Sequence, residues 1–178
     1  NNLVDARGAT DPAAVEGFRR MLRALDLDVR LADRMADWID RDIEPNFPDG
    51  AEDDTYLGRD TPYRAANSLM ISPSELLLVE GMTAEAYQAL LPHVAALPAR
   101  TRINVNTASA PVLMALGEGL AEADAQALIE GRGDEGYASL EDFLKQEALA
   151  GRKIDSAGLG VSTDYFIVNA MVQMGRFN

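Results

Sequence analysis

The stretch DWIDRDIEPNFPDGAEDDTY, residues 37–56, joins the end of an apolar pattern to a strongly acidic loop. Eight of its twenty residues are Asp or Glu, Arg41 is its only basic residue, and two prolines and a glycine shape its backbone. Carboxylates held within about 4–6 Å of one another disfavour each other's ionised state. A compact loop therefore needs protons, arginine or a metal cation, whereas an open loop would simply be solvated.

Oxygen donors alternate along the first half of this loop. They stand at every second position: Asp40, Asp42, Glu44 and Asn46. An EF-hand loop opens in the same way, but no glycine turn or twelfth-position glutamate follows here. Ca²⁺ takes about six to eight oxygens in flexible geometry, Mg²⁺ prefers fewer protein ligands, and Zn²⁺ prefers nitrogen or sulfur. From the spacing alone, a calcium site and a solvated loop both stay open.

Two amphipathic helices are predicted before the loop. Asp11 followed by Pro12 is typical of a helix start, because the carboxylate caps free amide groups and proline suits the first helical position. A second helix is predicted over residues 29–39. The inward-facing residues of the two helices are expected to be Val15, Phe18, Met21, Leu22, Leu25, Leu31, Met35, Trp38 and Ile39.

An internal repeat follows the loop. With an offset of 38 residues, PSELLLVEGMTAEAYQALL (73–91) matches PVLMALGEGLAEADAQALI (111–129), and Gly81 matches Gly119. Ser72 and Glu75 have the spacing of a capping box, which predicts a helix from there to Gly81. Each copy therefore predicts a helix, a tight turn and a second helix, at about 72–92 and 107–131, and we expect the copies to pack together.

The second copy, with INVNTA before it, resembles the helix-hairpin-helix module, in which backbone amides of a Gly-x-Gly turn bind DNA phosphates. The hairpin would be residues 116–120, with Glu118, Glu122 and Asp124 in that region and no lysine. The whole chain carries a net charge of −13, so this surface would repel phosphate. A DNA-binding protein therefore stays only as an alternative hypothesis. Because of the negative charge, we expect no nucleic-acid partner.

Composition limits the other function classes. The 178 residues, 47% of them hydrophobic, can bury a core, and the absence of cysteine excludes disulfides and thiolate metal sites. His93 is the only histidine, and no nucleophile and orienting acid are recognisable around it. A metal-dependent hydrolase that uses the acidic residues is the third hypothesis, and the sequence predicts a protein that is not an enzyme.

The end of the chain is strand-like. In VSTDYFIVNAMVQM (161–174), Phe166, Val168, Ala170 and Val172 fall on one side, and Leu3-Val4 predicts the end of another strand. Strands at the ends and helices between them predict an α+β protein with a helical insertion.

The chain contains seven motifs in this order: DWIDRD, PDGAEDDTY, PYRAAN, SELLLVEGM, INVNTA, SLEDF and STDYFIVNA. As a set, they resemble the general secretion pathway protein K family, the large minor pseudopilin of bacterial type II secretion systems. The resemblance runs from about Leu3 to Met174. It implies a pseudopilin-like small antiparallel sheet with a large inserted helical domain of duplicated helix-hairpin-helix or SAM-like units. Residues 1–27 and 155–178 would form the pseudopilin part, and 28–154 the inserted domain.

The resemblance also implies a function and a site. The family member lies at the tip of a periplasmic pseudopilus, with two other minor pseudopilins, of the I and J types, as partners. It is anchored in the inner membrane by an N-terminal helix, which we expect outside these 178 residues because no apolar run of about 18 residues occurs. Calcium is expected in the acidic loop, as one or two ions. The implied ligands are Asp40, Asp42, Glu44, Glu52 and Asp53, with Asn46, Asp49, Asp54 and Asn67 as weaker candidates.

Overall fold

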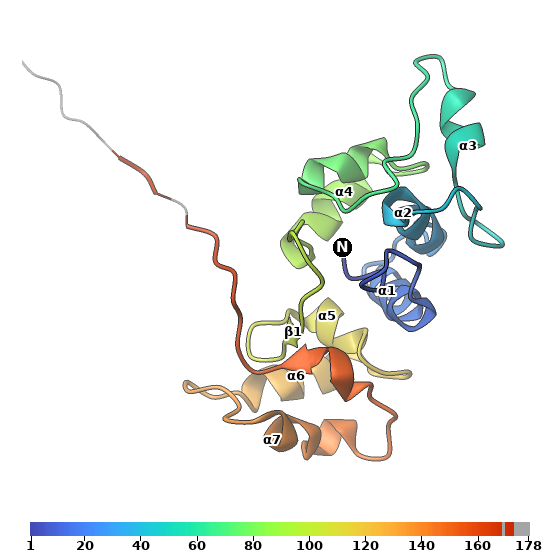
Figure 1. Cartoon of the computed structure of the whole chain (residues 1–178). Helices are drawn as coiled ribbons and strands as arrows, with labels where there is room; N and C mark the ends of the chain where they lie inside the picture. Colours follow the sequence, from blue (N-terminus) through green and yellow to red (C-terminus); the bar gives the residue numbers. More distant parts are fainter. Residues whose placement is uncertain (169, 173–178) are drawn as a thin grey trace, which may run out of the picture.

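Helices dominate the computed structural model, which describes residues 1–168 and 170–172. They form two groups (Figure 1), and each group has its own cluster of buried apolar side chains. The first cluster is built from residues 4–90, with Ala115 added from the second half, and the second from residues 105–159. Helices with a small two-stranded sheet make this an α+β fold, as predicted.

The first group begins with the two predicted amphipathic helices, which pack on each other. The carboxylate of Asp11 accepts hydrogen bonds from the amides of Ala13 and Ala14 and so begins the first helix. Shorter helices complete the group. Its elements are α1 (Pro12–Ala24), α2 (Leu31–Ile39), α3 (Asp53–Leu57), η1 (Pro73–Leu78), α4 (Ala84–Leu90) and η2 (Leu91–His93).

The helix α2 is the buried centre of this group. Eight of its nine residues are buried, among them Ala32 and Ala36, whose small side chains let neighbouring elements approach closely. A carboxylate in such surroundings needs a partner. Asp33 has one, because an Arg19 guanidinium nitrogen lies 2.5 Å from its Oδ1. Asp37 satisfies its carboxylate with amide groups of the acidic loop.

The second group surrounds Leu113, Leu128 and Phe143, all fully buried. The helices α5 and α6 pack on each other as a hairpin, and two short strands pair in parallel, with Ile103 opposite Leu159. The elements are β1 (Ile103–Asn104), α5 (Ala110–Met114), α6 (Glu122–Glu130), α7 (Leu140–Leu144), η3 (Glu147–Leu149), η4 (Ser156–Gly158) and β2 (Leu159–Gly160).

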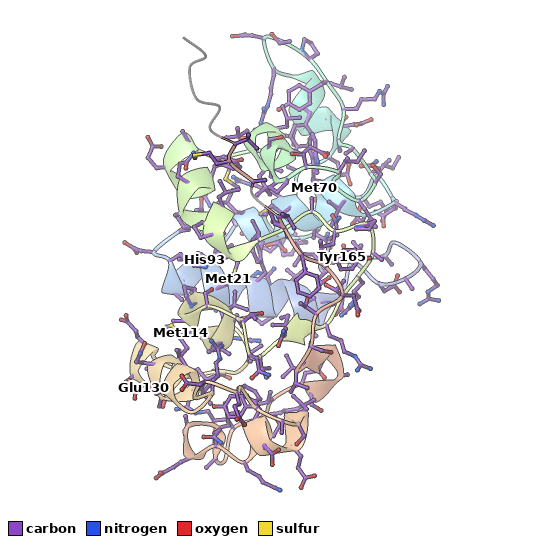
Figure 2. The ribbon with its side chains drawn as sticks, turned by 90° about the vertical axis from the view of Figure 1, so that its left-hand side faces the viewer. Met21, Met70, His93, Met114, Glu130 and Tyr165 are labelled. Carbon is purple, nitrogen blue, oxygen red and sulfur yellow. The ribbon has the colours of Figure 1, made fainter. Side chains whose placement is uncertain are left out.

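The two groups contact each other chiefly through α1 and α5. The Nε of Arg20 in α1 donates to the carbonyl of Ala115, just after α5, at 2.9 Å. His93, labelled in Figure 2, shares a hydrogen bond of 2.7 Å between its Nδ1 and the Oγ of Ser109, which precedes α5. The second group is therefore held to the first by polar contacts as well as by apolar packing.

The strand predictions are only partly confirmed. The described sheet is parallel, whereas an antiparallel sheet was expected, and Val4 forms a single antiparallel bridge with Thr10. Residues 161–168 and 170–172 form no strand; they run away from the body (Figure 1), and the side chains of Phe166 and Val172 are about four-fifths exposed. A strand needs a hydrogen-bonded neighbour, and the described chain offers none there. The rest of the predicted strand, Asn169, Gln173 and Met174, lies outside the described residues.

The predictions for the repeat are also partly corrected. The capping box at Ser72 forms, but the helix that it opens is 3₁₀ and ends at Leu78, before Gly81. Gly81 and Gly119 both have a positive φ, at +77° and +72°. The two copies do not share a core, contrary to expectation: Leu90 is buried in the first cluster and Leu128 in the second. Leu90 shares its cluster with residues of α1 and α2, such as Leu22 and Leu31.

Candidate metal centre

Three of the five predicted ligands come together in the acidic loop. Carboxylate oxygens of Asp40, Asp42 and Glu52 lie within 4.8 Å of one another. Asp40 directly follows α2 and Glu52 directly precedes α3, so the two helix ends bring them together across the loop. Asp40 and Glu52 are buried, at 1% and 4% exposed, while Asp42 is exposed to solvent. The cluster therefore has a buried floor and an open side.

Most of the buried oxygens in this cluster lack a partner. Oδ2 of Asp40 accepts a hydrogen bond of 2.7 Å from the hydroxyl of Thr10. Oδ1 of Asp40 and both oxygens of Glu52 have no hydrogen-bond partner among the described residues. A buried carboxylate without partners is costly, so such a group takes up a proton or meets a cation. The donor set is all oxygen, which fits a hard cation such as Ca²⁺ or Mg²⁺.

The pKa values show the cost of ionising this cluster. Burial raises the pKa of Glu52 to about 7, and repulsion from Asp37, Asp40 and Asp42 adds to the effect. Burial likewise raises the pKa of Asp40 to about 6, again with repulsion from Asp42 and Asp37. A bound cation would remove this penalty, because it favours the ionised form of each carboxylate.

Asp37 holds the acidic loop in its folded shape. Its buried carboxylate accepts hydrogen bonds from the backbone amides of Asn46, at 3.1 Å, and Ala51, at 2.6 Å, and from the side-chain amide of Asn46. A Cβ at Gly50 would collide with the Asp37 carboxylate and the Asn46 backbone, so only glycine fits. Since Ala51 precedes Glu52, this arrangement places Glu52 opposite Asp40. Sequence reasoning did not single out Asp37, although an acidic residue among buried neighbours in α2 was a usable signal.

The other predicted ligands lie elsewhere. Asp53 makes an ion pair with Arg64 and accepts from the amide of Ala65 at 3.1 Å. Glu44 is exposed and uses its backbone amide to bond Asp42 at 3.0 Å. The weaker candidates have other contacts. Asn46 donates to Asp37, and the backbone carbonyl of Asp49 accepts from Arg34. Asp54 is exposed, and Asn67 has a buried side-chain oxygen with no hydrogen-bond partner among the described residues. The ligand roles stay predictions, and the geometry favours Asp40, Asp42 and Glu52.

Aromatic packing supports the helix that carries Glu52. Tyr56 of α3 is fully buried, and its ring lies edge-on to Trp38 of α2 at 5.2 Å and stacks on Tyr63 at 5.4 Å. The Arg59 guanidinium lies 5.1 Å from both tyrosine rings and pairs with Glu80 at 2.5 Å. These contacts fix α3 against α2, and so they set the distance between Glu52 and Asp40.

The fold and the site together define a mostly helical α+β protein with a buried carboxylate cluster between α2 and α3. Within its described residues, no helix has the length and apolar character that crossing a membrane requires. The chain belongs to the type II secretion system protein K family. Two models of that family, each described as "Type II secretion system (T2SS), protein K", match residues 1–99 and 103–162. Their boundary falls between the two apolar clusters.

Relatives with this name confirm the assignment. The chain is 41% identical to type II secretion system protein K of Pseudomonas aeruginosa, over 98% of this chain and 53% of the relative. It is 36% identical to that of Klebsiella pneumoniae, over 98% of this chain and 58% of the relative. The chain spans about half the length of these curated relatives.

A solved structure has the same fold. It is a chain of the crystal structure of the GspK-GspI-GspJ complex from the type 2 secretion system of enterotoxigenic Escherichia coli. The TM-score is 0.73 with 30% sequence identity, and the match covers 90% of this chain and 64% of that chain.

Proposed function

We propose that this chain is the helical portion of a K-type minor pseudopilin that takes part in assembling a type II secretion pseudopilus. Membership of the protein K family, over nearly the whole chain, carries the proposal. The role is non-enzymatic: the chain serves assembly for protein secretion on the periplasmic side of the inner membrane. The membrane anchor would be an N-terminal helix of the longer protein.

The partners would be the I-type and J-type minor pseudopilins of the same system. The similar solved structure is described as a complex of GspK, GspI and GspJ, which supports this. Residues 1–27 and 155–178 would contribute to the pseudopilin part, and 28–154 to the inserted helical domain, whose bulk would block further subunits and place the protein at the tip.

Assembly with these partners can be tested directly. The full-length protein, with its anchor removed, is mixed with the I-type and J-type subunits of the same species and analysed by size-exclusion chromatography with light scattering. A three-component complex supports the proposal. In a pseudopilus assembly reaction the labelled protein should lie at one end of each fibre, and labelling along the fibre would contradict the tip role.

Calcium would stabilise the helical domain through the carboxylate cluster. Asp40, Asp42 and Glu52 would hold the ion, with backbone carbonyls and water completing its coordination, and the ion would supply the positive charge that the cluster lacks. The unpartnered oxygens of Asp40 and Glu52 support this assignment. Thermal melting in EDTA, then with Ca²⁺ or Mg²⁺ restored, tests it: we expect a rise with Ca²⁺ and little change with Mg²⁺. An unchanged melting temperature would mean that the loop is only solvated.

The two repeat copies would be helix-hairpin-helix-like units retained for packing rather than for DNA. The matching positive φ at Gly81 and Gly119 supports a common turn. An electrophoretic mobility shift assay with duplex DNA at low salt tests the DNA-binding alternative, and a salt-sensitive shift would favour it.

A further inference from the structure

Residues 1–10 form a segment that lies against the candidate metal centre. Val4 bridges Thr10, and between them the carbonyl of Gly8 accepts a hydrogen bond of 3.0 Å from the amide of Arg41. Gly8 has a φ of +83°, and a Cβ there would lie 2.6 Å from Cδ of Arg41, so glycine permits this close approach. The chain start lies in the middle of the molecule, beside α1 (Figure 1).

The hydroxyl of Thr10 joins this segment to two sides of the loop. It donates to Oδ2 of Asp40 at 2.7 Å and accepts from Nδ2 of Asn46 at 3.1 Å. The same Nδ2 donates to the carboxylate of Asp37. An Asn NH₂ group can only donate, so it occupies a lone pair of the hydroxyl and leaves the hydroxyl hydrogen for Asp40. The chain of hydrogen bonds therefore has one direction, from Asn46 through Thr10 to Asp40.

The hydrogen bond from Thr10 sets the orientation of the Asp40 carboxylate in the cluster. Oδ2 is engaged by Thr10, while Oδ1 is buried and has no partner among the described residues. A hydrogen bond to one oxygen of a carboxylate restricts rotation of the whole group and fixes where the other oxygen lies. Groups that orient metal ligands in this way strongly influence metal affinity.

We propose that Thr10 is a positioning residue of the metal centre, which orients Asp40 toward the cation and couples cation binding to the docking of residues 1–10. The inference rests on the proposed calcium site. Because coupling is reciprocal, a cation that stabilises the Asp40 orientation also stabilises the docked segment, and the reverse holds.

At the other end of the segment, Asn1 and Asn2 bond parts of the chain that are distant from the metal centre. The side chain of Asn1 donates to the carbonyls of Met70, at 2.9 Å, and Leu97, at 2.6 Å, and accepts from the amide of Met70 at 2.9 Å. Asn2 exchanges two hydrogen bonds with the backbone of Thr101, at 2.8 and 3.1 Å. Residues 97 and 101 belong to the connection between the two helical groups. The segment thus links the metal centre to that connection.

The experiment compares metal-free wild type with Thr10→Val, Thr10→Ala and Thr10→Ser by calorimetric titration with Ca²⁺. Loss of the hydroxyl should weaken binding about 10-fold or more, and Thr10→Ser should bind within about twofold of wild type. Thr107→Val, an exposed position in the second group, is the matched control and should leave binding unchanged. Hydrogen exchange of the amides of residues 3–11 should slow on Ca²⁺ addition in wild type and much less in Thr10→Val.

The outcomes separate this inference from the calcium proposal. Wild type that binds Ca²⁺, with Thr10→Val or Thr10→Ala of equal affinity, would overturn the positioning role alone. Equal losses in Thr10→Ser and Thr10→Val would also overturn it, because the hydroxyl would not be the cause. If the hydrogen-exchange rates of residues 3–11 do not change on Ca²⁺ addition, the proposed coupling is wrong. Wild type that binds no Ca²⁺ would refute the calcium site and this inference together.

Discussion

Glu52 shows at the scale of one residue how the acidic loop differs from an ordinary solvated one. Its side chain is 4% exposed, and neither carboxylate oxygen has a hydrogen-bond partner among the described residues. Two other carboxylates of the stretch have partners: Asp37 accepts from amides, and Asp53 pairs with Arg64. The unsatisfied charge is thus concentrated where Glu52 meets Asp40, and the predictions at this scale concern it.

Replacing Glu52 by Gln should separate the response to calcium from stability without metal. Gln keeps the size of the side chain and removes a charge that is costly to bury, so the metal-free protein should melt no lower than wild type. The rise in melting temperature on Ca²⁺ addition should fall to a small part of the wild-type rise. Differential scanning calorimetry with and without Ca²⁺ checks both.

Glu135→Gln is the matched control, since Glu135 is an exposed glutamate of the second helical group, outside the loop and the cluster. It should respond to Ca²⁺ as wild type does. An unreduced Ca²⁺ response in Glu52→Gln would remove Glu52 from the ligand set.

The metal-free protein should lose stability as the pH rises from about 5 to about 7.5. Asp40 and Glu52 have pKa values of about 6 and about 7 when folded, against ordinary values of 3.8 and 4.5. In this range the folded state holds protons that the unfolded chain has released, so raising the pH favours unfolding. Urea midpoints of protein stripped of metal, at the two pH values, measure the effect. Glu52→Gln should show a smaller pH dependence; a midpoint that rises with pH would contradict the assignment.

At the scale of elements, the two repeat copies have a glycine with positive φ at the matching position, in different surroundings. Gly81 and Gly119 both have a positive φ, which costs a residue with a Cβ about 1–2 kcal/mol. Their neighbours differ. A Cβ at Gly81 would collide with the Arg34 guanidinium, whereas at Gly119 the nearest atom, of Arg152, is 3.2 Å away.

Alanine substitution of both glycines tests this comparison. Gly81→Ala and Gly119→Ala should each lower the free energy of unfolding by about 1–2 kcal/mol through backbone strain. Gly81→Ala should cost more, because Arg34 also gives up its bonds to the carbonyls of Asp49 and Glu80 when it is displaced. Urea unfolding followed by circular dichroism measures the difference. Gly133 has a φ of +55°, and a Cβ there would meet no atom within 4 Å, so Gly133→Ala isolates the backbone strain.

At the scale of the whole molecule, the two helical groups have separate apolar clusters but shared boundaries. Ala115 of the second half belongs to the first cluster, and Arg20 bonds its carbonyl. Asn2 and Thr101, and His93 with Ser109, add polar links between the halves. Because these contacts link the two groups, unfolding of one group should destabilise the other.

We expect one cooperative transition for the whole chain. Trp38 is the single tryptophan and reports on the first group, while far-ultraviolet circular dichroism reports on helices of both groups. The two signals should give the same midpoint in urea, in metal-free protein and with Ca²⁺. Arg20→Ala should lower the midpoint by removing a link between the groups. Midpoints that differ between the two signals in wild type would show that the groups unfold separately.

The sequence by itself determined the first two helices, the acidic loop and the family. Periodicity and capping residues act over a few neighbours, so α1, α2 and the capping box at Ser72 were predictable from local spacing. The acidic loop was equally visible, since charge density needs no fold to be counted.

Only the tertiary structure decided which of those charges meet. Asp40, Asp42 and Glu52 are brought together because Asp37 folds the loop and Tyr56 fixes α3 against Trp38, whereas Asp53 turns to Arg64. Thr10 joins the site from about 30 residues away in sequence. The tertiary structure also gave the repeat copies separate cores and left residues 161–168 without a strand partner. These outcomes depend on contacts between distant segments, which local patterns do not encode.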